Sequence, residues 1–133
     1  MCGKNIYDKN PVHRKINEVL PDEIILDIGD ASTQFISNKI INSKMVLWNG
    51  PVGAFEFKPY DKATNAIASV IKLNAKKLNI NTLAGGGDTV SAIKNTHAEE
   101  WFNYISNAGG AFLEWLEGNE SPGVKSLKEN NLN

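Results

Sequence analysis

Three short apolar segments of this chain each lead into a turn of glycine or polar residues. After each turn, directly or after a loop, comes a segment whose apolar residues recur at helical spacing. The apolar segments lie at residues 45–48, 80–84 and 101–106. The turns that follow them are Asn49-Gly50-Pro51, Gly85-Gly86-Gly87-Asp88-Thr89 and Ala108-Gly109-Gly110-Ala111. Strands that alternate with helices, without hairpin dipeptides, favour a parallel sheet with helices on both faces. The pattern therefore predicts an α/β fold of three layers.

Further elements extend this alternation toward both ends of the chain. Residues 23–29 are predicted to form an additional buried strand. Helices are expected at 33–43 with Ser32 as N-cap, at 61–78 with Asp61 as N-cap, at 88–94, and at 112–116 before Gly118. Residues 1–22 are polar and irregular, and the asparagine-rich residues 128–133 are expected to fray. The folded domain is therefore expected to span residues 23–127.

The two glycine-rich turns are expected to form an anion site. The first turn of a helix carries unpaired backbone N–H groups and about half a positive charge, and glycines at its entrance let an anion approach. In a parallel sheet the loops after the strands meet at the carboxyl edge, where ligands bind. Two such helix starts suggest a polyphosphate ligand. The carboxylate of Asp88 beside the first one suggests an accompanying divalent cation.

Structural explanations for these residues stay open at this point. The turn at residues 85–89 also suits a plain strand-to-helix connection, and Gly109 also suits close backbone packing. Asp88 is equally compatible with a helix N-cap, and Thr89 with either a helix start or a hydroxyl donor to phosphate. The chain holds neither the P-loop pattern nor the dinucleotide fingerprint, whose third glycine is replaced by Val90.

The loop after residues 45–48 carries a further candidate. In Asn49-Gly50-Pro51-Val52-Gly53-Ala54-Phe55-Glu56 a rigid Gly-Pro turn fixes the course of the chain. The carboxylate of Glu56 can accept hydrogen bonds from the hydroxyls of a ribose. A solvated Glu56, in a loop pinned by Phe55 and Phe57, is the structural alternative.

Composition argues against several other functions. A formal net charge of −1 without a sustained basic run gives no basis for binding nucleic acid or an acidic membrane. No apolar stretch approaches the ~18–20 residues of a membrane span, and the first residues lack the apolar core of a secretory signal. His13, His97 and Cys2 show no metal-ligand spacing, and no nucleophile is placed with a histidine for catalysis. The single cysteine fits a reducing compartment, so a cytoplasmic location is expected.

Four blocks together resemble the C-terminal part of phosphoglycerate kinase. They are residues 46–56, 85–89, 109–118 and 122–124, and Leu26-Asp27-Ile28-Gly29 is similar to a further strand end of that family. The similarity runs in order from about residue 19 to residue 127. It implies a Rossmann-like nucleotide-binding domain, of which this chain supplies the second half. The resemblance covers only the last third or so of a family member.

The resemblance implies a role for each matching residue. Glu56 matches the glutamate that binds the nucleotide ribose, and Asp88 matches the carboxylate that holds the metal–nucleotide complex. Gly86 and Gly109 match the glycines whose backbone N–H groups face the transferring phosphoryl group, and they are the catalytic candidates. The nucleotide-binding candidates are Asn49, Pro51, Glu56, Gly85, Gly86, Gly87, Asp88 and Thr89. The implied cofactor is Mg²⁺ with ATP or ADP, and Asp88 is its expected ligand.

The resemblance also implies an activity that this sequence cannot complete. The family transfers a phosphoryl group reversibly from 1,3-bisphosphoglycerate to ADP, giving 3-phosphoglycerate and ATP in glycolysis. The N-terminal domain with its phosphoglycerate site, and the lysine that stabilises the transferred group, have no counterpart in these 133 residues, so we expect catalysis only when the rest is supplied, either by a complementing N-terminal chain or by the remainder of a longer protein. The alternative hypothesis is a non-catalytic remnant or nucleotide-binding module without turnover. Asn107 and Ala108 also replace the family's usual Thr-Gly before Gly109.

Overall fold

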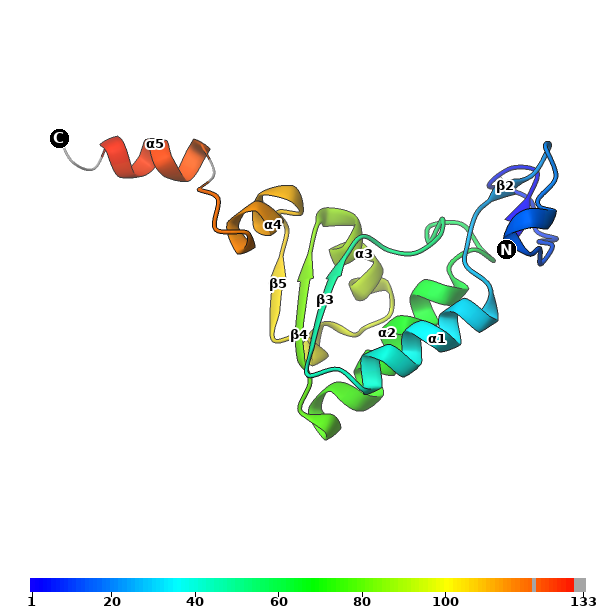
Figure 1. Cartoon of the computed structure of the whole chain (residues 1–133), viewed down its shortest axis with the longest axis horizontal. Helices are drawn as coiled ribbons and strands as arrows, with labels where there is room; N and C mark the ends of the chain where they lie inside the picture. The colour runs from blue at the N-terminus through cyan, green and yellow to red at the C-terminus, as the bar shows by residue number, and fades with distance from the viewer. Residues whose placement is uncertain (121, 131–133) are drawn as a thin grey trace.

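The computed structural model describes residues 1–120 and 122–130 of the 133-residue chain and shows strands and helices in alternation (Figure 1). The strands are β1 (Cys2–Gly3), β2 (Ile24–Ile25), β3 (Met45–Asn49), β4 (Asn81–Gly85) and β5 (Tyr104–Ser106). The helices are α1 (Asp30–Ile41), α2 (Lys62–Leu78), α3 (Gly87–Asn95), α4 (Gly110–Leu116) and α5 (Pro122–Asn130), with the short 3₁₀ helices η1 (Ile16–Glu18) and η2 (Glu99–Trp101).

Strands β3, β4 and β5 form one parallel sheet in that order. Helix α2 joins β3 to β4, and α3 with η2 joins β4 to β5, so each connection is a β-α-β crossover. The α/β class with a parallel sheet is confirmed. The last strand is shorter than predicted, because Trp101 ends η2 and β5 begins only at Tyr104. Since the three strands run in one direction, their carboxyl ends share one edge of the sheet.

The covered face of the sheet packs on helices. Side chains alternate along β3, so Val46 and Trp48 belong to the main apolar cluster while Met45 and Leu47 are exposed. Helix α2 contributes residues at helical spacing to this cluster: Ile67, Ala68, Ile71 and Ala75. Helix α1 lies along α2 (Figure 1). The core therefore lies between the sheet and the layer formed by α1, α2 and α3.

Replacing Ile71 by Val should lower the free energy of unfolding by about 0.5–1.5 kcal/mol, because it removes one buried methylene and leaves a small cavity. Ile71 has an exposed fraction of 0%. Denaturant unfolding followed by circular dichroism measures the change. Ile16→Val removes the same group from a side chain that is 84% exposed, so this matched control should leave stability unchanged. Equal effects of the two substitutions would contradict the core position of Ile71.

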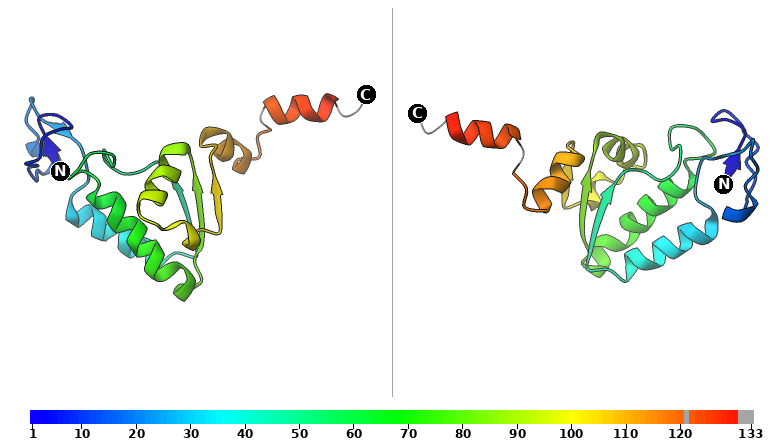
Figure 2. Two further views of the ribbon diagram at one scale, coloured as in Figure 1. Left: turned by 180° about the vertical axis from the view of Figure 1, so that it is seen from behind. Right: turned by 45° about the horizontal axis from the view of Figure 1, so that its top comes forward.

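Helices α1, α2 and α3 lie on one side of the sheet and leave its other face uncovered (Figures 1 and 2). Leu47, Leu83 and Tyr104 are register partners across the three strands, so they form a row on one face, which we call the bare face. Leu47 is 42% and Tyr104 53% exposed. Parallel sheets usually bury both faces, so an exposed apolar row of this kind favours contact with another protein segment.

The prediction of a buried strand over residues 23–29 is wrong. Within this run only β2 is a strand, and it pairs antiparallel with β1 rather than joining the parallel sheet. Its two isoleucines are 50% and 53% exposed, so the strand part of this run lies at the surface. Leu26 instead enters a second, smaller apolar cluster with Met1 and Tyr60. This cluster packs the N-terminal segment against the loop that follows β3.

Two helix starts differ from the predictions in their capping. Helix α1 begins at Asp30 with Gly29 as N-cap, so Ser32 is not the cap. Asp61 is the N-cap of α2 as predicted, but its side chain makes no capping hydrogen bond. Its carboxylate instead accepts a hydrogen bond from Asn65 Nδ2 at 2.8 Å. One unpaired N–H group at the start of α2, that of Ala63, instead donates to the side chain of Asp27, described below.

Helix α5 extends away from the sheet at the end of the chain (Figure 1). Of the residues predicted to fray, 128–130 belong to α5, and 131–133 lie outside the described residues. Within the described part of the chain, no helix combines the length and the apolar character that crossing a membrane requires.

Candidate functional site

The three predicted turns lie together at the carboxyl edge of the sheet. A Cβ atom built on Gly109 would lie 3.2 Å from Gly86 Cα, and one built on Gly86 would lie 3.1 Å from Asn49 Oδ1. Asn49 ends β3, Gly86 follows β4 and Gly109 follows β5, so each turn contributes one residue to this contact. The turns therefore converge, as the parallel topology predicts.

The start of α3 is open to a ligand. Gly86, its N-cap, has φ +96° and ψ 140°, a conformation that is readily adopted only by glycine. The first helical bond runs from Val90 N to Gly86 O at 3.0 Å. The N–H groups of residues 87–89 precede that bond and have no partner within the helix. A Cβ on Gly87 would meet no atom within 4 Å, so an anion could approach these donors closely.

The N–H group of Gly86 does not face this opening. It donates to Ser106 O at 3.0 Å and continues the pairing of β4 with β5. The predicted role of Gly86 as an N–H donor to phosphate is therefore corrected: the free donors at this turn belong to residues 87–89. Gly86 contributes the turn itself, because its backbone conformation redirects the chain from strand to helix.

Asp88 and Thr89 are adjacent on α3 but lie in different surroundings. Asp88 is exposed, and because Gly86 is the N-cap, the interpretation of Asp88 as N-cap is wrong. Thr89 is completely buried, and its Oγ1 accepts a hydrogen bond from Gly50 N at 2.6 Å. The hydroxyl can still donate its own proton. Thr89 thus ties the turn after β3 to α3, while Asp88 is left available to a ligand.

Both backbone polar groups of Gly50, its N–H and its carbonyl, are hydrogen-bonded. Besides the bond from its N–H to Thr89, its carbonyl accepts a hydrogen bond from Trp48 Nε1 at 2.7 Å. Its φ of +97° is a conformation that favours glycine. These contacts fix the positions of Asn49 and Pro51 on either side of it.

The second glycine turn is held by local bonds and by packing. Ser106 Oγ bonds to both the N–H and the carbonyl of Ala108, each at 3.2 Å. Ala108 is not among the residues with positive φ, so the alanine found here in place of the family's usual glycine needs no strained backbone. A Cβ on Gly85 would lie 2.8 Å from Phe112 Cδ1, which shows how closely α4 packs on the end of β4.

Glu56 is not part of the contact among the three turns. It is exposed and lines a hollow of about 310 Å³ together with Phe55, Lys58, Asp61, Asn65 and Asn95. Asn95 is the last residue of α3, so this helix borders the glycine turn at one end and the hollow at the other. A helix of 9 residues is about 13 Å long, which separates the two places.

The structural role of Asp27 was not predicted from the sequence. The side chain is buried, with 2% exposed, and its carboxylate accepts hydrogen bonds from Ile28 N at 2.8 Å and from Ala63 N at 3.1 Å. Burial raises the pKa of the Asp27 carboxyl, and the two N–H hydrogen bonds oppose that rise. Ala63 lies in the first turn of α2, 36 residues further along the chain. A cap so distant in sequence leaves no local signal.

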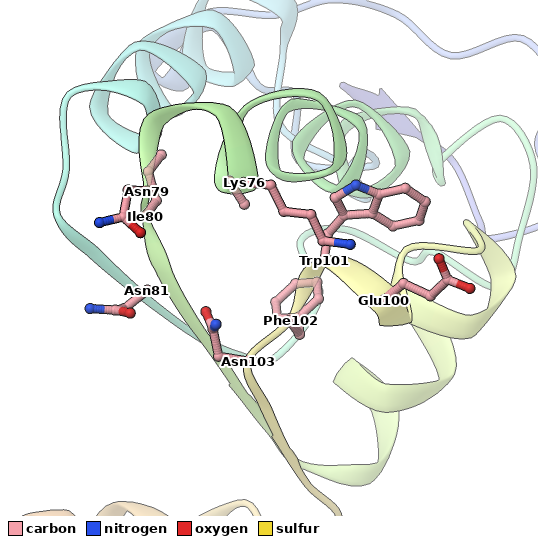
Figure 3. Close-up of a pocket in the computed structure, with 9 residues that line it drawn as sticks. Lys76, Asn79, Ile80, Asn81, Glu100, Trp101, Phe102 and Asn103 are labelled. Carbon is pink, nitrogen blue, oxygen red and sulfur yellow. The ribbon is translucent and has the colours of Figure 1, made fainter.

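Another hollow lies at the opposite edge of the sheet, where β4 and β5 begin (Figure 3). It measures about 240 Å³ and is lined by Ala75, Lys76, Asn79, Ile80, Asn81, Glu100, Trp101, Phe102 and Asn103. Asn103 Oδ1 accepts a hydrogen bond from Thr82 N at 2.7 Å, and the Nζ atoms of Lys72 and Lys76 lie 4.7 and 5.5 Å from the Trp101 ring. These groups serve packing, and ligands of parallel sheets bind at the other edge.

The donor set at the glycine turn suits magnesium. Within residues 1–120 and 122–130, no three histidine, cysteine, aspartate or glutamate side chains gather into a metal-binding group. Mg²⁺ does not require such a group, because it usually keeps several waters and takes one or two carboxylates plus substrate phosphates. The single exposed carboxylate of Asp88, beside an open helix start, fits that requirement.

Comparisons with known proteins agree on one family. The family model described as phosphoglycerate kinase matches residues 2–119. The phosphoglycerate kinase of Rhodospirillum centenum is 46% identical over 112 residues, which make up 84% of this chain and 28% of that protein. That of Zymomonas mobilis subsp. mobilis is 44% identical over 124 residues, which are 92% of this chain and 31% of that protein.

A solved structure supports the same relation. Phosphoglycerate kinase from Coxiella burnetii matches with a TM-score of 0.82 and 29% identity, over 97% of this chain and 32% of that chain. The chain therefore spans only 28–31% of the length of the two relatives named above. The matched region includes the parallel sheet and all three turns at its carboxyl edge. The chain belongs to the phosphoglycerate kinase family.

Proposed function

We propose that this chain is the ATP- and ADP-binding part of a phosphoglycerate kinase, the enzyme of glycolysis that transfers a phosphoryl group reversibly from 1,3-bisphosphoglycerate to ADP. The contact between Gly86 and Gly109 carries the proposal, because it brings two helix starts to one place. Phosphoryl transfer needs positioning and stabilisation of negative charge more than covalent chemistry. Backbone N–H groups at helix starts supply both.

Each residue of the site takes a role in this proposal. Gly86 shapes the first turn, and the N–H of Gly87 serves as its donor, while Gly109 presents its N–H to the transferring phosphoryl group from the second turn. Asp88 holds Mg²⁺, which neutralises part of the phosphate charge when bound with the nucleotide. Glu56 accepts hydrogen bonds from the ribose hydroxyls. The remaining nucleotide-binding residues are Asn49, Pro51, Gly85 and Thr89.

The complete reaction needs protein beyond this sequence. 1,3-Bisphosphoglycerate and 3-phosphoglycerate would bind only together with the N-terminal domain that the family resemblance implies, and a complementing N-terminal chain is one source of that domain. We propose a cytoplasmic location and neither a nucleic-acid nor a membrane partner. The division into segment 1–22, partial domain 23–127 and tail 128–133 belongs to the same proposal.

Asp88→Ala tests the nucleotide site directly. It should weaken binding of Mg-ADP about ten- to hundredfold, because the carboxylate proposed to hold the metal is removed. Binding of ADP without the metal should change little. Isothermal titration calorimetry on the full chain, with and without Mg²⁺, measures both affinities.

A matched control is Asp30→Ala, since Asp30 is also an exposed aspartate in the first turn of a helix. This control should bind Mg-ADP as the wild-type chain does. A wild-type chain that does not bind Mg-ADP would contradict the proposed function. An Asp88→Ala chain that binds as tightly as wild type would contradict the role of Asp88.

A further inference from the structure

Asp27 is a buried carboxylate that the proposed function does not use. Each of its oxygens accepts one backbone N–H: Oδ1 from Ile28 at 2.8 Å and Oδ2 from Ala63 at 3.1 Å. Ala63 lies in the first turn of α2, where unpaired N–H groups and the positive end of the helix dipole favour a carboxylate. Asp27 therefore caps α2 from a distant segment of the chain.

The same carboxylate touches the loop that leads to Glu56. Gly53 has φ +70°, and a Cβ built on it would overlap Asp27 Oδ1 and lie 2.7 Å from Asp27 Cγ. The neighbouring residue on each segment adds a hydrogen bond, from Ala54 N to Leu26 O at 2.7 Å. The loop backbone at residues 53–54 thus rests directly on residues 26–27.

Helix α2 holds the same loop from the other side. Thr64, next to Ala63, donates its hydroxyl to the carbonyl of Val52. Because the carboxylate of Asp27 fixes the N–H of Ala63, it also sets the position from which Thr64 reaches the loop. Residues 52–54 are therefore held between two segments that Asp27 joins, and Glu56 follows two positions later.

We propose that Asp27 is a positioning residue for the nucleotide loop: its carboxylate holds residues 52–54 and thereby sets where Glu56 meets the ribose. The inference rests on the proposed function only for the assignment of the ribose to Glu56. A carboxylate is required because both oxygens accept N–H groups. An asparagine offers only one oxygen, and its NH₂ group would face a second donor.

Asp27→Asn is the test, with two measurements on the full chain. The first is amide hydrogen exchange at residues 54 and 63, whose N–H groups are hydrogen-bonded in this region, and it should become about tenfold faster or more when one hydrogen bond to a charged group is lost. The second is calorimetric titration with Mg-ADP and with Mg-tripolyphosphate, which has the phosphates but no ribose. Mg-ADP affinity should fall about tenfold, while Mg-tripolyphosphate affinity should stay at the wild-type value.

Asp22→Asn is the matched control. The side chain of Asp22 is 63% exposed and pairs with an exposed lysine, Lys4, at 3.4 Å, so exchange and both affinities should be unchanged. If the role of Asp27 were merely structural, Asp27→Asn would lower the affinities for both ligands equally or change neither. Equal losses of affinity for the two ligands, or unchanged exchange at residue 54, would overturn the inference.

The design also covers two other outcomes. If Asp27→Asn does not fold, Gly53→Ala displaces the loop from the same carboxylate, and it should show the same selective loss of Mg-ADP affinity. A Gly53→Ala chain with wild-type affinity for both ligands would overturn the inference. If the wild-type chain binds neither ligand, the proposed function fails, and the exchange data alone decide whether Asp27 holds the loop.

Discussion

By itself the chain should form no ATP from 1,3-bisphosphoglycerate and ADP, and mixing it with the complementary N-terminal portion of a phosphoglycerate kinase should restore ATP formation. The chain spans only 28–31% of its named relatives, and the resemblance places the phosphoglycerate site and a stabilising lysine in the rest. Loss of a single transition-state donor typically costs about 10²–10³ in rate. Loss of a cation and a whole substrate site should therefore leave no measurable turnover. A coupled assay of ATP production measures both states.

The bare face offers a place where the complement would dock. Leu47 lies in this row and is 42% exposed, so Leu47→Glu should put a charge into the assembled interface and lower ATP formation about tenfold or more. The matched control is Leu73→Glu, at a residue that is 73% exposed on α2, on the helical side of the sheet. The mixture that contains this variant should assemble and form ATP at the wild-type rate. Sedimentation of each mixture shows whether the two chains associate.

Three outcomes of this experiment separate the hypotheses. Restored ATP formation that depends on Leu47 supports a catalytic half-domain. A mixture that demonstrably assembles and binds Mg-ADP but forms no ATP would favour the non-catalytic nucleotide-binding module. Robust turnover by the chain alone, in a sample free of contaminating kinase, would show that the expectation of an incomplete enzyme is wrong.

Sequence patterns predicted the parallel sheet because its elements carry strong local signals. The helix expected at 61–78 is α2, Lys62–Leu78, since its apolar residues recur at helical spacing over several turns. The strands expected at 45–48 and 80–84 are β3 and β4 within one residue at the ends. The glycine turns follow these strands, so their meeting at one edge follows from the topology alone.

Other features depended on contacts between distant segments and could not be predicted. The apolar run at 23–29 gives the same local pattern whether it joins the parallel sheet or pairs with β1, and only tertiary structure decides. The side chain that caps α2 is that of Asp27, whereas Asp61, the N-cap residue that the local pattern predicted, makes no side-chain capping hydrogen bond. The N–H of Gly86 is engaged by Ser106, a partner 20 residues away that a motif cannot show.

Gly86→Ala should lower the turnover of the complemented enzyme by about 10²–10³ and the free energy of unfolding by about 1–3 kcal/mol. The φ of +96° at Gly86 is strained for any residue with a Cβ, and that atom would lie 3.1 Å from Asn49 Oδ1. Relief of this strain would rotate the start of α3 and move the N–H groups of residues 87–89 away from the phosphates. Steady-state kinetics of the mixture and denaturant unfolding of the chain measure the two effects.

The contact between the two turns makes this prediction sharper. Gly109→Ala places a Cβ 3.2 Å from Gly86 Cα, so it disturbs the same contact from the other side. Because the two glycines touch, the double substitution should cost less than the sum of the single ones. Gly123→Ala is the control, since its Cβ would meet no atom within 4 Å and it lies in α5, so turnover should be unchanged. Strictly additive losses of turnover on substituting Gly86 and Gly109 would mean that the two turns act separately. That result would contradict the shared phosphoryl site on which the proposed function depends.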